Sequence, residues 1–220
     1  PGIREPDPES RRAYHSSPMR LILASSSPYR QELLARLRLP FEAVAADVDE
    51  TPLPHEPIVD LAARLAALKA ETILARHPDA LVIGSDQVGT LDGVTPIGKP
   101  GTLERARLQL QAASGRIMHF HTALALRGRG LAPIDDAVCV EVAFRTLTLA
   151  DIDRYLALED VLNCAGSARC EGLGISLLES IRTDDPTALI GLPLIRLSAH
   201  LRQLGVDVPA AATPSSERTS

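Results

Sequence analysis

Short apolar runs alternate along this chain with longer segments in which apolar residues recur every three or four positions. The run 20–24 leads into a helical pattern that starts at Pro28, with Ser27 placed as its N-cap. A second helical pattern covers 58–76 and is followed by the wholly apolar run 81–84. Because the run 81–84 suits a central strand buried on both faces, the alternation predicts an α/β domain.

The second half of the chain predicts an antiparallel extension of this sheet. A helical pattern over 102–113 precedes two segments of alternating side-chain character, 117–126 and 137–146, which a Gly-, Pro- and Asp-containing loop joins. Together they predict a β-hairpin. Further helices are expected from Thr148 and over 193–204. The expected fold class is therefore α/β, with a mixed central sheet flanked by helices.

Length and composition fit one folded domain. The chain has 220 residues, of which 45% are hydrophobic, so it can bury a core near the upper size of a single domain. We expect that domain to cover residues 19–208. The polar segment 1–18 and the Ala-, Pro-, Ser- and Thr-rich segment 209–220 lack periodicity, and we expect both to be disordered.

Charge, aromatic content and cysteine content exclude several classes of function. A net charge of -5 with interspersed signs offers no basic surface to a nucleic acid polymer, and 3% aromatic residues without Trp cannot build a base-stacking platform. Three cysteines without a CxxC pair argue against a disulfide framework and a structural zinc site. No apolar run approaches the roughly 20 residues that cross a bilayer. We expect a cytoplasmic protein, without a membrane partner, that holds any anionic ligand by a local cluster of cations.

The segment 25–30 combines hydroxyl groups and free backbone N–H groups at a helix N-terminus, directly after a strand. This arrangement is typical of an anion site. Arg30 lies in the first turn, where a cation opposes the helix dipole, so a bound phosphate explains it better than helix stability does. An ordinary serine cap with a solvated arginine explains the local features equally well.

Asp86 follows the run 81–84, and we expect it at the end of that strand, where carboxylates of α/β enzymes meet metals and substrates. Burying an unpaired carboxylate is costly, so Asp86 there needs a partner. Alternatively, it only starts a turn towards Asp92-Gly93. Lys69 lies within or beside the apolar stripe of 58–76, so its ammonium either enters a cleft or simply reaches solvent.

Two further segments have unusual backbone restrictions. Lys99 stands between Gly98 and Pro100, as a fixed phosphate contact requires. The glycine-bearing stretch 163–174 predicts either backbone that approaches a ligand or a plain flexible loop.

The acidic residues Asp47, Asp49 and Glu50 are candidate ligands of a divalent cation, or else part of a solvated loop. Asp47-x-Asp49-x-Thr51 also matches the nucleophile motif of haloacid-dehalogenase-like phosphatases, which form an aspartyl-phosphate. That motif should open the first strand of a Rossmann-like unit. Here the first strand comes earlier and Pro52 follows the motif, so this phosphatase is a remote alternative.

In their order along residues 20–205, these elements resemble the Maf family. Each motif is weak alone, but the ordered combination is highly specific. The motifs are Ser-x-Ser-Pro-x-Arg-x-Glu-Leu-Leu at 25–34, Asp49-Glu50, Lys69 after Arg64-Leu65-Ala66, Gly84-Ser85-Asp86-Gln87-Val88, Gly98-Lys99-Pro100, Phe144-Arg145, Cys164-Ala165-Gly166-Ser167, Glu171-Gly172-Leu173-Gly174 and Gly191-Leu192-Pro193-Leu194.

The resemblance implies a Maf/ITPase-like fold with two lobes around a cleft, a homodimer, and Mg²⁺ or Mn²⁺ as cofactor. It also implies hydrolysis of a nucleoside triphosphate between its α and β phosphates, which releases a monophosphate and pyrophosphate. Asp86 resembles the family's proton acceptor and, with Glu50, its acidic residues on the metal side. The residues that resemble its phosphate contacts are Ser25, Arg30, Lys69 and Lys99.

The trio Tyr29, Gln87 and Glu171 resembles the substrate-specificity residues of the subfamily that hydrolyses 7-methyl-GTP. Many Maf proteins have two adjacent arginines after Ser-Pro and a threonine after the acid, whereas here Tyr29 precedes Arg30 and Gln87 follows Asp86. The implied role is removal of a modified nucleotide. The alternatives are a dTTP/UTP pyrophosphatase of the other subfamily and a nucleotide-binding regulator of cell division.

Overall fold

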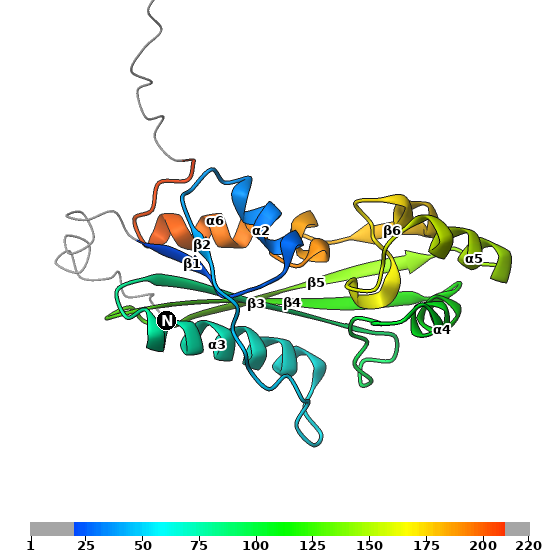
Figure 1. Ribbon diagram of the computed structural model, residues 1–220, viewed down its shortest axis with the longest axis horizontal. Coiled ribbons are helices and arrows are strands. Elements are labelled where there is room, and N and C mark those ends of the chain that lie inside the picture. Colours follow the sequence, from blue (N-terminus) through cyan, green and yellow to red (C-terminus); the bar gives the residue numbers. More distant parts are fainter. Residues whose placement is uncertain (1–19, 210–220) are drawn as a thin grey trace, which may run out of the picture.

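A six-stranded mixed sheet with helices on both faces organises this protein, as a computed structural model that describes residues 20–209 shows (Figure 1). The order is β2-β1-β3-β4-β5-β6, with β1 parallel to β2 and β3 and the remaining neighbours antiparallel. The predicted α/β class and the predicted hairpin are confirmed. The segments predicted to be disordered, 1–18 and 209–220, lie outside the described residues except for Pro209. The strands are β1 (Leu21–Leu23), β2 (Glu42–Ala43), β3 (Leu81–Thr90), β4 (Ile117–Gly128), β5 (Ile134–Phe144) and β6 (Leu178–Arg182).

Side-chain caps start three of the helices where the sequence predicted them. Ser27, Thr102 and Thr148 each accept a hydrogen bond from a backbone N–H in the first turn, and Asp151 completes a capping box with Thr148. Between α5 and α6, the helical segments are short 3₁₀ turns. The helices are α2 (Pro28–Ala35), α3 (Ile58–Arg76), α4 (Leu103–Ala113), α5 (Leu149–Leu158) and α6 (Leu194–Gln203), and the 3₁₀ turns are η1 (Ala165–Ser167), η2 (Leu173–Leu177) and η3 (Pro186–Ile190).

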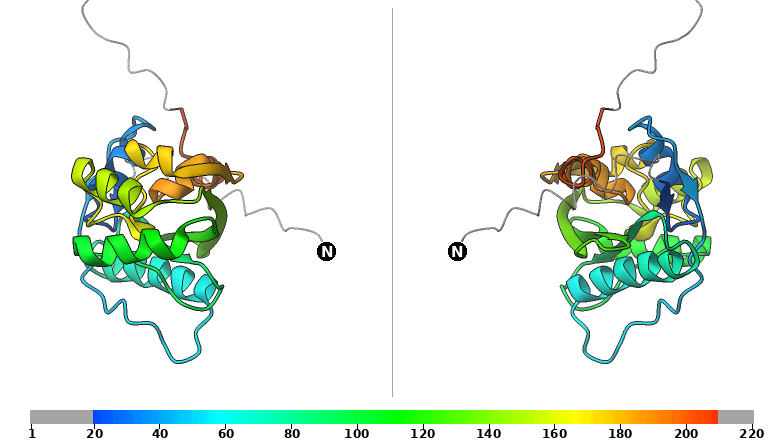
Figure 2. Two further views of the ribbon diagram at one scale, coloured as in Figure 1. Left: turned by 90° about the vertical axis from the view of Figure 1, so that its right-hand side faces the viewer. Right: turned by 90° about the vertical axis from the view of Figure 1, so that its left-hand side faces the viewer.

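The sheet is continuous, but its two halves have separate apolar cores. Along one half, α3 covers one face while α2 and α6 cover the other (Figures 1 and 2). In the other half, apolar residues of α4 and α5 pack with those of β4 and β5. The expected two lobes therefore share one sheet, and the cleft between them lies where loops of both halves meet.

Close packing of α3 against β3 depends on Gly84. A Cβ atom at this position would overlap the carbonyl oxygen of Ala66 and lie 2.9 Å from the Cβ of Ala70. Because alternate residues of a strand share a face, Asp86 points to the same side as Gly84, towards α3. Lys69 lies about one helical turn beyond Ala66. The missing side chain of Gly84 thus lets α3 come close enough for Lys69 to reach Asp86.

The strand that carries Asp86 is longer than predicted. The sequence placed Asp86 at the strand end, but β3 continues to Thr90, and Asp86 lies mid-strand opposite Ala123 of β4. Its polar residues continue the strand because their side chains find partners within the fold. The hydroxyl of Ser85 lies 2.8 Å from the carbonyl oxygen of Ala123, and Asp86 pairs with Lys69.

Candidate active site

A pocket of about 240 Å³ lies where α2, α3 and β3 meet the loops at 98–99, 163–171 and 189–191. The elements that supply it are far apart in the sequence, and the folded sheet brings them together. All the predicted site residues except Ser25 line this pocket. They are Tyr29, Arg30, Glu50, Lys69, Asp86, Gln87, Lys99 and Glu171.

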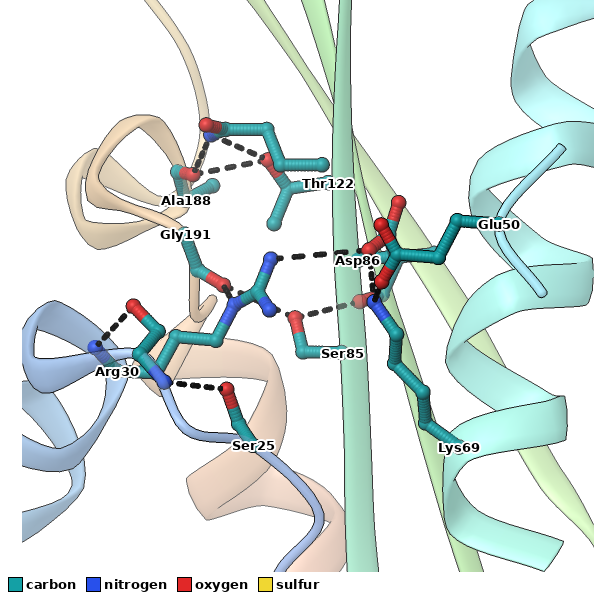
Figure 3. A network of polar contacts seen from close by, with 12 residues as sticks. Ser25, Arg30, Glu50, Lys69, Ser85, Asp86, Thr122, Ala188 and Gly191 are labelled. Carbon is teal, nitrogen blue, oxygen red and sulfur yellow. Dashed lines mark hydrogen bonds and ion pairs between the residues drawn. The ribbon is translucent and has the colours of Figure 1, made fainter. Parts of the chain in front are cut away.

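Four side chains of the pocket form an ion-paired group, the Asp86 cluster, which consists of Arg30, Glu50, Lys69 and Asp86 (Figure 3). The ammonium of Lys69 lies 2.6 Å from Asp86 Oδ1 and 2.5 Å from Glu50 Oε1, while Arg30 Nη2 lies 4.0 Å from the same oxygen of Asp86. The side chains of Lys69 and Asp86 are only 8% and 10% exposed. Asp86 therefore has the partner that its burial requires, and it does not start a turn.

Charge balance shifts the pKa values around this cluster. Partial burial would raise the pKa of Glu50, but the hydrogen bond from Lys69 and the nearby charges of Lys69, Lys99 and Arg30 lower it overall. Burial lowers the pKa of Arg30, against the opposing charges of Asp86 and Glu50. These groups act on one another at short range, and the exposed side chain of Lys99 belongs to the same electrostatic neighbourhood.

One oxygen of Asp86 has no partner in this cluster. Within residues 20–209, both ion pairs of Asp86 end on Oδ1, and no hydrogen-bond donor reaches Oδ2. The carboxylate is thus held in place by Lys69 and Arg30 through one oxygen. Its other oxygen can accept a proton or a hydrogen bond from a ligand.

The backbone oxygen of Gly191 holds Arg30 in this position. Arg30 Nε donates a hydrogen bond of 2.9 Å to it, and the hydroxyl of Ser85 lies 2.9 Å from the same oxygen (Figure 3). Gly191 has a φ of 122°, which favours glycine, and an added Cβ would lie 3.4 Å from Arg30 Nε. Arg30 is therefore a fixed group, not a solvated one, and it is held by a residue 161 positions away.

The two serines Ser25 and Ser27 before α2 differ in their access to the pocket. Ser25 is buried and its hydroxyl accepts a hydrogen bond of 3.1 Å from the backbone N–H of Ser27. Ser27 lines the pocket and its hydroxyl lies 3.5 Å from the backbone nitrogen of Arg30. The structure therefore places Ser27 at the pocket surface and Ser25 behind it, and direct phosphate contact by Ser25 stays a prediction.

Contacts to the backbone define how Gln87 faces the pocket. Its amide nitrogen Nε2 donates to the carbonyl oxygens of Ala188 and Leu189, at 2.8 and 3.0 Å, and lies 3.0 Å from the hydroxyl of Thr122. Since carbonyl oxygens only accept hydrogen bonds, the amide cannot flip without losing these contacts. No donor in the described part of the chain reaches Gln87 Oε1, which leaves an acceptor for a ligand.

A second ion-paired group, the Glu171 cluster, consists of Tyr29, Glu159, Arg169 and Glu171. The guanidinium carbon of Arg169 lies 5.5 Å from the centre of the Tyr29 ring. Arg169 donates from Nε to Glu171 at 3.1 Å and from Nη1 to Glu159 at 3.0 Å. Glu159 and Arg169 could not be predicted as site residues, because no sequence motif links a helix end at 159 to a loop at 169.

The carboxylates of the pocket can hold a divalent cation only with help from a ligand. In residues 20–209, no group of three or more His, Cys, Asp or Glu is placed to hold a metal ion. Glu50 and Asp86 converge on a single cation, the ammonium of Lys69. Magnesium is commonly held by one or two protein carboxylates plus phosphate oxygens of a substrate. The two carboxylates therefore fit a divalent cation that binds together with a nucleotide.

The other acidic residues of this loop do not support a phosphatase of the haloacid-dehalogenase type. Asp47 and Asp49 do not line the pocket, and Asp49 instead accepts a hydrogen bond of 2.9 Å from the backbone of Thr51. Both follow the two-residue edge strand β2 and not a central strand. The motif of such a phosphatase should belong to the first strand of the unit, so the match is one of sequence only.

Comparison with known proteins shows the family to which this chain belongs. The family described as Maf-like protein matches residues 20–204. The chain belongs to the Maf family. Several Maf relatives carry the name "7-methyl-GTP pyrophosphatase". One from Bordetella pertussis is 56% identical over 86% of this chain and 94% of its own length. One from Xanthomonas axonopodis pv. citri is 56% identical over 86% of this chain and 99% of its own length. A third, from Burkholderia pseudomallei, is 54% identical over 91% and 95%.

Solved structures resemble this Maf chain only weakly. A nucleoside-triphosphatase / dITP/XTP pyrophosphatase from Mycobacterium abscessus matches over 57% of this chain and 74% of its own length, at 17% identity and a TM-score of 0.42. In the part of the Maf chain that the structure describes, no helix has the length and apolar character of a membrane span.

Proposed function

We propose that this Maf protein is a nucleoside-triphosphate pyrophosphatase that cleaves between the α and β phosphates and prefers 7-methyl-GTP. One observation carries the proposal: the same pocket holds the Asp86 cluster and, beside it, the aromatic ring of Tyr29 and the carboxylate of Glu171. The first group suits phosphate chemistry and the second suits a positively charged base. The names of relatives that are 54% to 56% identical over most of the chain support the same function.

Three cations are available to the triphosphate. Arg30 and Lys69 are held by ion pairs and by Gly191, and Lys99 adds a third charge from the loop at 98–99. Cations that are preorganised around the phosphates stabilise the negative charge that develops on the leaving pyrophosphate. Because every nucleoside triphosphate carries the same phosphates, these residues should contribute to rate and affinity without selecting a base.

Asp86 is the proposed general base. Its Oδ1 is held by Lys69 and Arg30, while Oδ2 is free to accept a proton from a water molecule that attacks the α phosphorus. The bond between the α phosphorus and the bridging oxygen then breaks, and pyrophosphate leaves with that oxygen. The proton of the water molecule moves to Asp86. Because water attacks the phosphorus directly, the reaction needs no covalent intermediate.

Glu50 and Asp86 are the proposed ligands of Mg²⁺ or Mn²⁺, together with phosphate oxygens of the nucleotide. Such a cation, when bound, neutralises phosphate charge and polarises the reacting group. The convergence of both carboxylates on Lys69 supports this assignment. We expect removal of divalent cations by EDTA to abolish turnover, and Glu50→Gln to weaken Mg²⁺ binding in a calorimetric titration with a non-hydrolysable nucleotide analogue.

The base would contact Tyr29, Gln87 and Glu171. Methylation of guanine at N7 creates a delocalised positive charge, which an aromatic face and a carboxylate both attract. Guanine also presents N–H donors on its Watson–Crick edge, and Gln87, which lines the pocket, keeps its acceptor Oε1 without a donor among the described residues. Uracil and thymine lack both the charge and the adjacent pair of donors.

A substrate screen tests the proposal. Purified protein is incubated with 7-methyl-GTP, GTP, UTP or dTTP and Mg²⁺ or Mn²⁺, and both pyrophosphate and orthophosphate are quantified. We expect pyrophosphate release, fastest with 7-methyl-GTP. A preference for dTTP or UTP would assign the chain to the other Maf subfamily. Orthophosphate as first product would contradict α–β cleavage, and binding without turnover would favour the regulator of cell division.

Domain extent, location and assembly are part of the same proposal. Residues 19–208 would act as one catalytic domain in the cytoplasm, as a homodimer. Cys139, Cys164 and Cys170 are free in the structure, as a reducing compartment would keep them. Light scattering of the full chain and of a chain limited to 19–208, with activity measured for both, checks the domain and the dimer.

A further inference from the structure

The Glu171 cluster already contains a cation of its own. Arg169 lies over the ring of Tyr29 and donates to Glu171, so it contacts both groups that would recognise a positively charged base. Tyr29 and Glu171 line the pocket, but Arg169 does not. The guanidinium therefore contacts both of these side chains without lining the pocket itself.

Local packing keeps Arg169 in that place. Its backbone N–H donates a hydrogen bond of 2.9 Å to the hydroxyl of Tyr155, a residue of α5. A Cβ atom at Gly174 would lie 2.5 Å from the backbone nitrogen of Arg169, so the chain passes close on this side as well. Its side chain is 33% exposed and has a carboxylate on each side. Arg169 is a fixed part of the wall and not a free surface arginine.

Glu159 is the second carboxylate that competes for Arg169. It lies at the end of α5, its side chain is 13% exposed, and its Oε2 accepts a hydrogen bond of 2.8 Å from the backbone of Leu173. A Cβ atom at Gly172 would lie 2.5 Å from Glu159 Oε2. The space left by Gly172 thus admits this carboxylate, which holds one end of the guanidinium.

The sharing of one guanidinium leaves Glu171 incompletely neutralised. Glu159, Arg169 and Glu171 together carry two negative charges and one positive charge. The second oxygen of Glu171 lies 3.6 Å from the Cys170 thiol, which is a weak and uncharged donor. Asp160, an exposed carboxylate nearby, adds more negative charge that solvent screens. The wall therefore presents a net negative charge to the pocket through Glu171.

We propose that Glu159 and Arg169 are positioning residues that set the selectivity of the pocket for a cationic base, an inference that rests on the proposed function. Glu159 draws the guanidinium partly away from Glu171, so Glu171 retains charge for the base. Arg169 limits that charge and holds Glu171 and Tyr29 in place. The residue facing the base is then tuned by two residues that do not touch it.

The test compares kcat/KM for 7-methyl-GTP and GTP, whose ratio cancels effects on the shared phosphates. Glu159→Gln leaves Arg169 to Glu171 alone, so the ratio should fall, by roughly threefold to tenfold. Arg169→Met exposes the full charge of Glu171, so the ratio should rise by a similar factor, even if both absolute rates fall. The double variant has the same net charge as wild type, one negative charge, which is now that of Glu171 alone. Its ratio should therefore return to within about twofold of wild type.

Two controls separate charge from structure. Arg169→Lys retains the charge and should keep the ratio within about twofold of wild type, and Glu179→Gln removes an exposed carboxylate on β6, away from the pocket, and should change nothing. A purely structural role predicts losses that accumulate in the double variant, with no opposite shifts. Thermal unfolding identifies any variant that does not fold. If Glu159→Gln or the double variant does not fold, Arg169→Met and Arg169→Lys decide the sign, and if Arg169→Met does not fold, Glu159→Gln decides it.

Failure of this inference is distinct from failure of the proposed function. If wild type does not favour 7-methyl-GTP over GTP, the proposed base preference is wrong. If wild type favours it but Glu159→Gln and Arg169→Met shift the ratio in the same direction, or by less than about 1.5-fold, charge sharing is overturned and the function stands.

Discussion

The Asp86 cluster and the Glu171 cluster each place one basic side chain between two carboxylates, but they expose different charges to the pocket. In the first, Lys69 lies between Glu50 and Asp86 and lines the pocket with both of them. In the second, Arg169 is shared between Glu159 and Glu171 but does not line the pocket. The carboxylate of Glu171 does line it, so this cluster presents a negative charge to the ligand.

The scaffolds of the two clusters differ as well. The Asp86 cluster is built mainly on regular elements, since Lys69 belongs to α3 and Asp86 to the middle of β3. Apart from Tyr29 of α2, the Glu171 cluster is built on the irregular segment after α5, held by hydrogen bonds to Tyr155 and Leu173. A rigid group suits the phosphates, which all nucleotides share. A loop suits base recognition, because loops can change without disturbing the sheet.

Asp86→Asn should have the largest effect, because an amide retains the shape of the carboxylate but cannot serve as base. We expect kcat to fall by about 100-fold or more for every substrate, with the fold and most of the nucleotide affinity kept. Steady-state kinetics and a binding titration measure the two effects. Asp153→Asn, a change in an exposed carboxylate paired with Arg107 on the surface, is the control. A loss below about tenfold would be too small for the principal base.

Lys69→Met should lower kcat/KM by about tenfold to 100-fold for every nucleotide, without re-ranking the bases. Without the ammonium, the negative charges of Glu50 and Asp86 lose their shared ion-pair partner. We therefore also expect the free energy of unfolding to fall by about 1 to 3 kcal/mol. This is less than for a fully buried pair, because the side chain of Glu50 is 60% exposed. Urea denaturation measures this change. Arg30→Ala and Lys99→Ala should likewise lower kcat/KM for all substrates by similar factors. If one of these substitutions reorders the base preference, that residue contacts the base instead of the phosphates.

Glu171→Gln should act selectively and more weakly. We expect kcat/KM for 7-methyl-GTP to fall by about tenfold and that for GTP or UTP by less than about twofold, because only the methylated base loses a charge partner. The same kinetic assays on these substrates measure it. An equal loss of kcat/KM with all three substrates would mean that Glu171 stabilises the pocket without selecting the base. The contrast between the two clusters would then disappear.

Changes at Tyr29 should be the smallest. Tyr29→Ala removes an aromatic face that contributes about 0.5 to 1 kcal/mol to a partly exposed cation contact, so 7-methyl-GTP should lose about twofold to fivefold in kcat/KM. Tyr29→Trp should be tolerated or improve turnover, since indole attracts cations more strongly. Titration with 7-methyl-GMP, followed by calorimetry, checks whether the effect lies in binding. Weaker binding by the Trp variant would show that ring size, and not the π face, matters here.

Part of the fold was predictable because its signals are local. Ser27, Thr102 and Thr148 mark helix starts by hydrogen bonds within one turn, and all three were identified from the sequence. The end of β3 was not, because Asp86 interrupts the apolar pattern and its partner Lys69 lies on another element. The edge strands β2 and β6 were also missed, since two and five residues give too short a pattern to recognise.

The sequence by itself determined the family and most of the pocket-lining residues, because an ordered set of motifs specifies chemistry residue by residue. Only the tertiary structure decided what those residues do to one another. Gly191 holds Arg30 from 161 positions away, backbone carbonyls orient Gln87, and Glu159 shares Arg169 with Glu171. These contacts depend on distance and direction between separate elements, and a one-dimensional pattern contains neither.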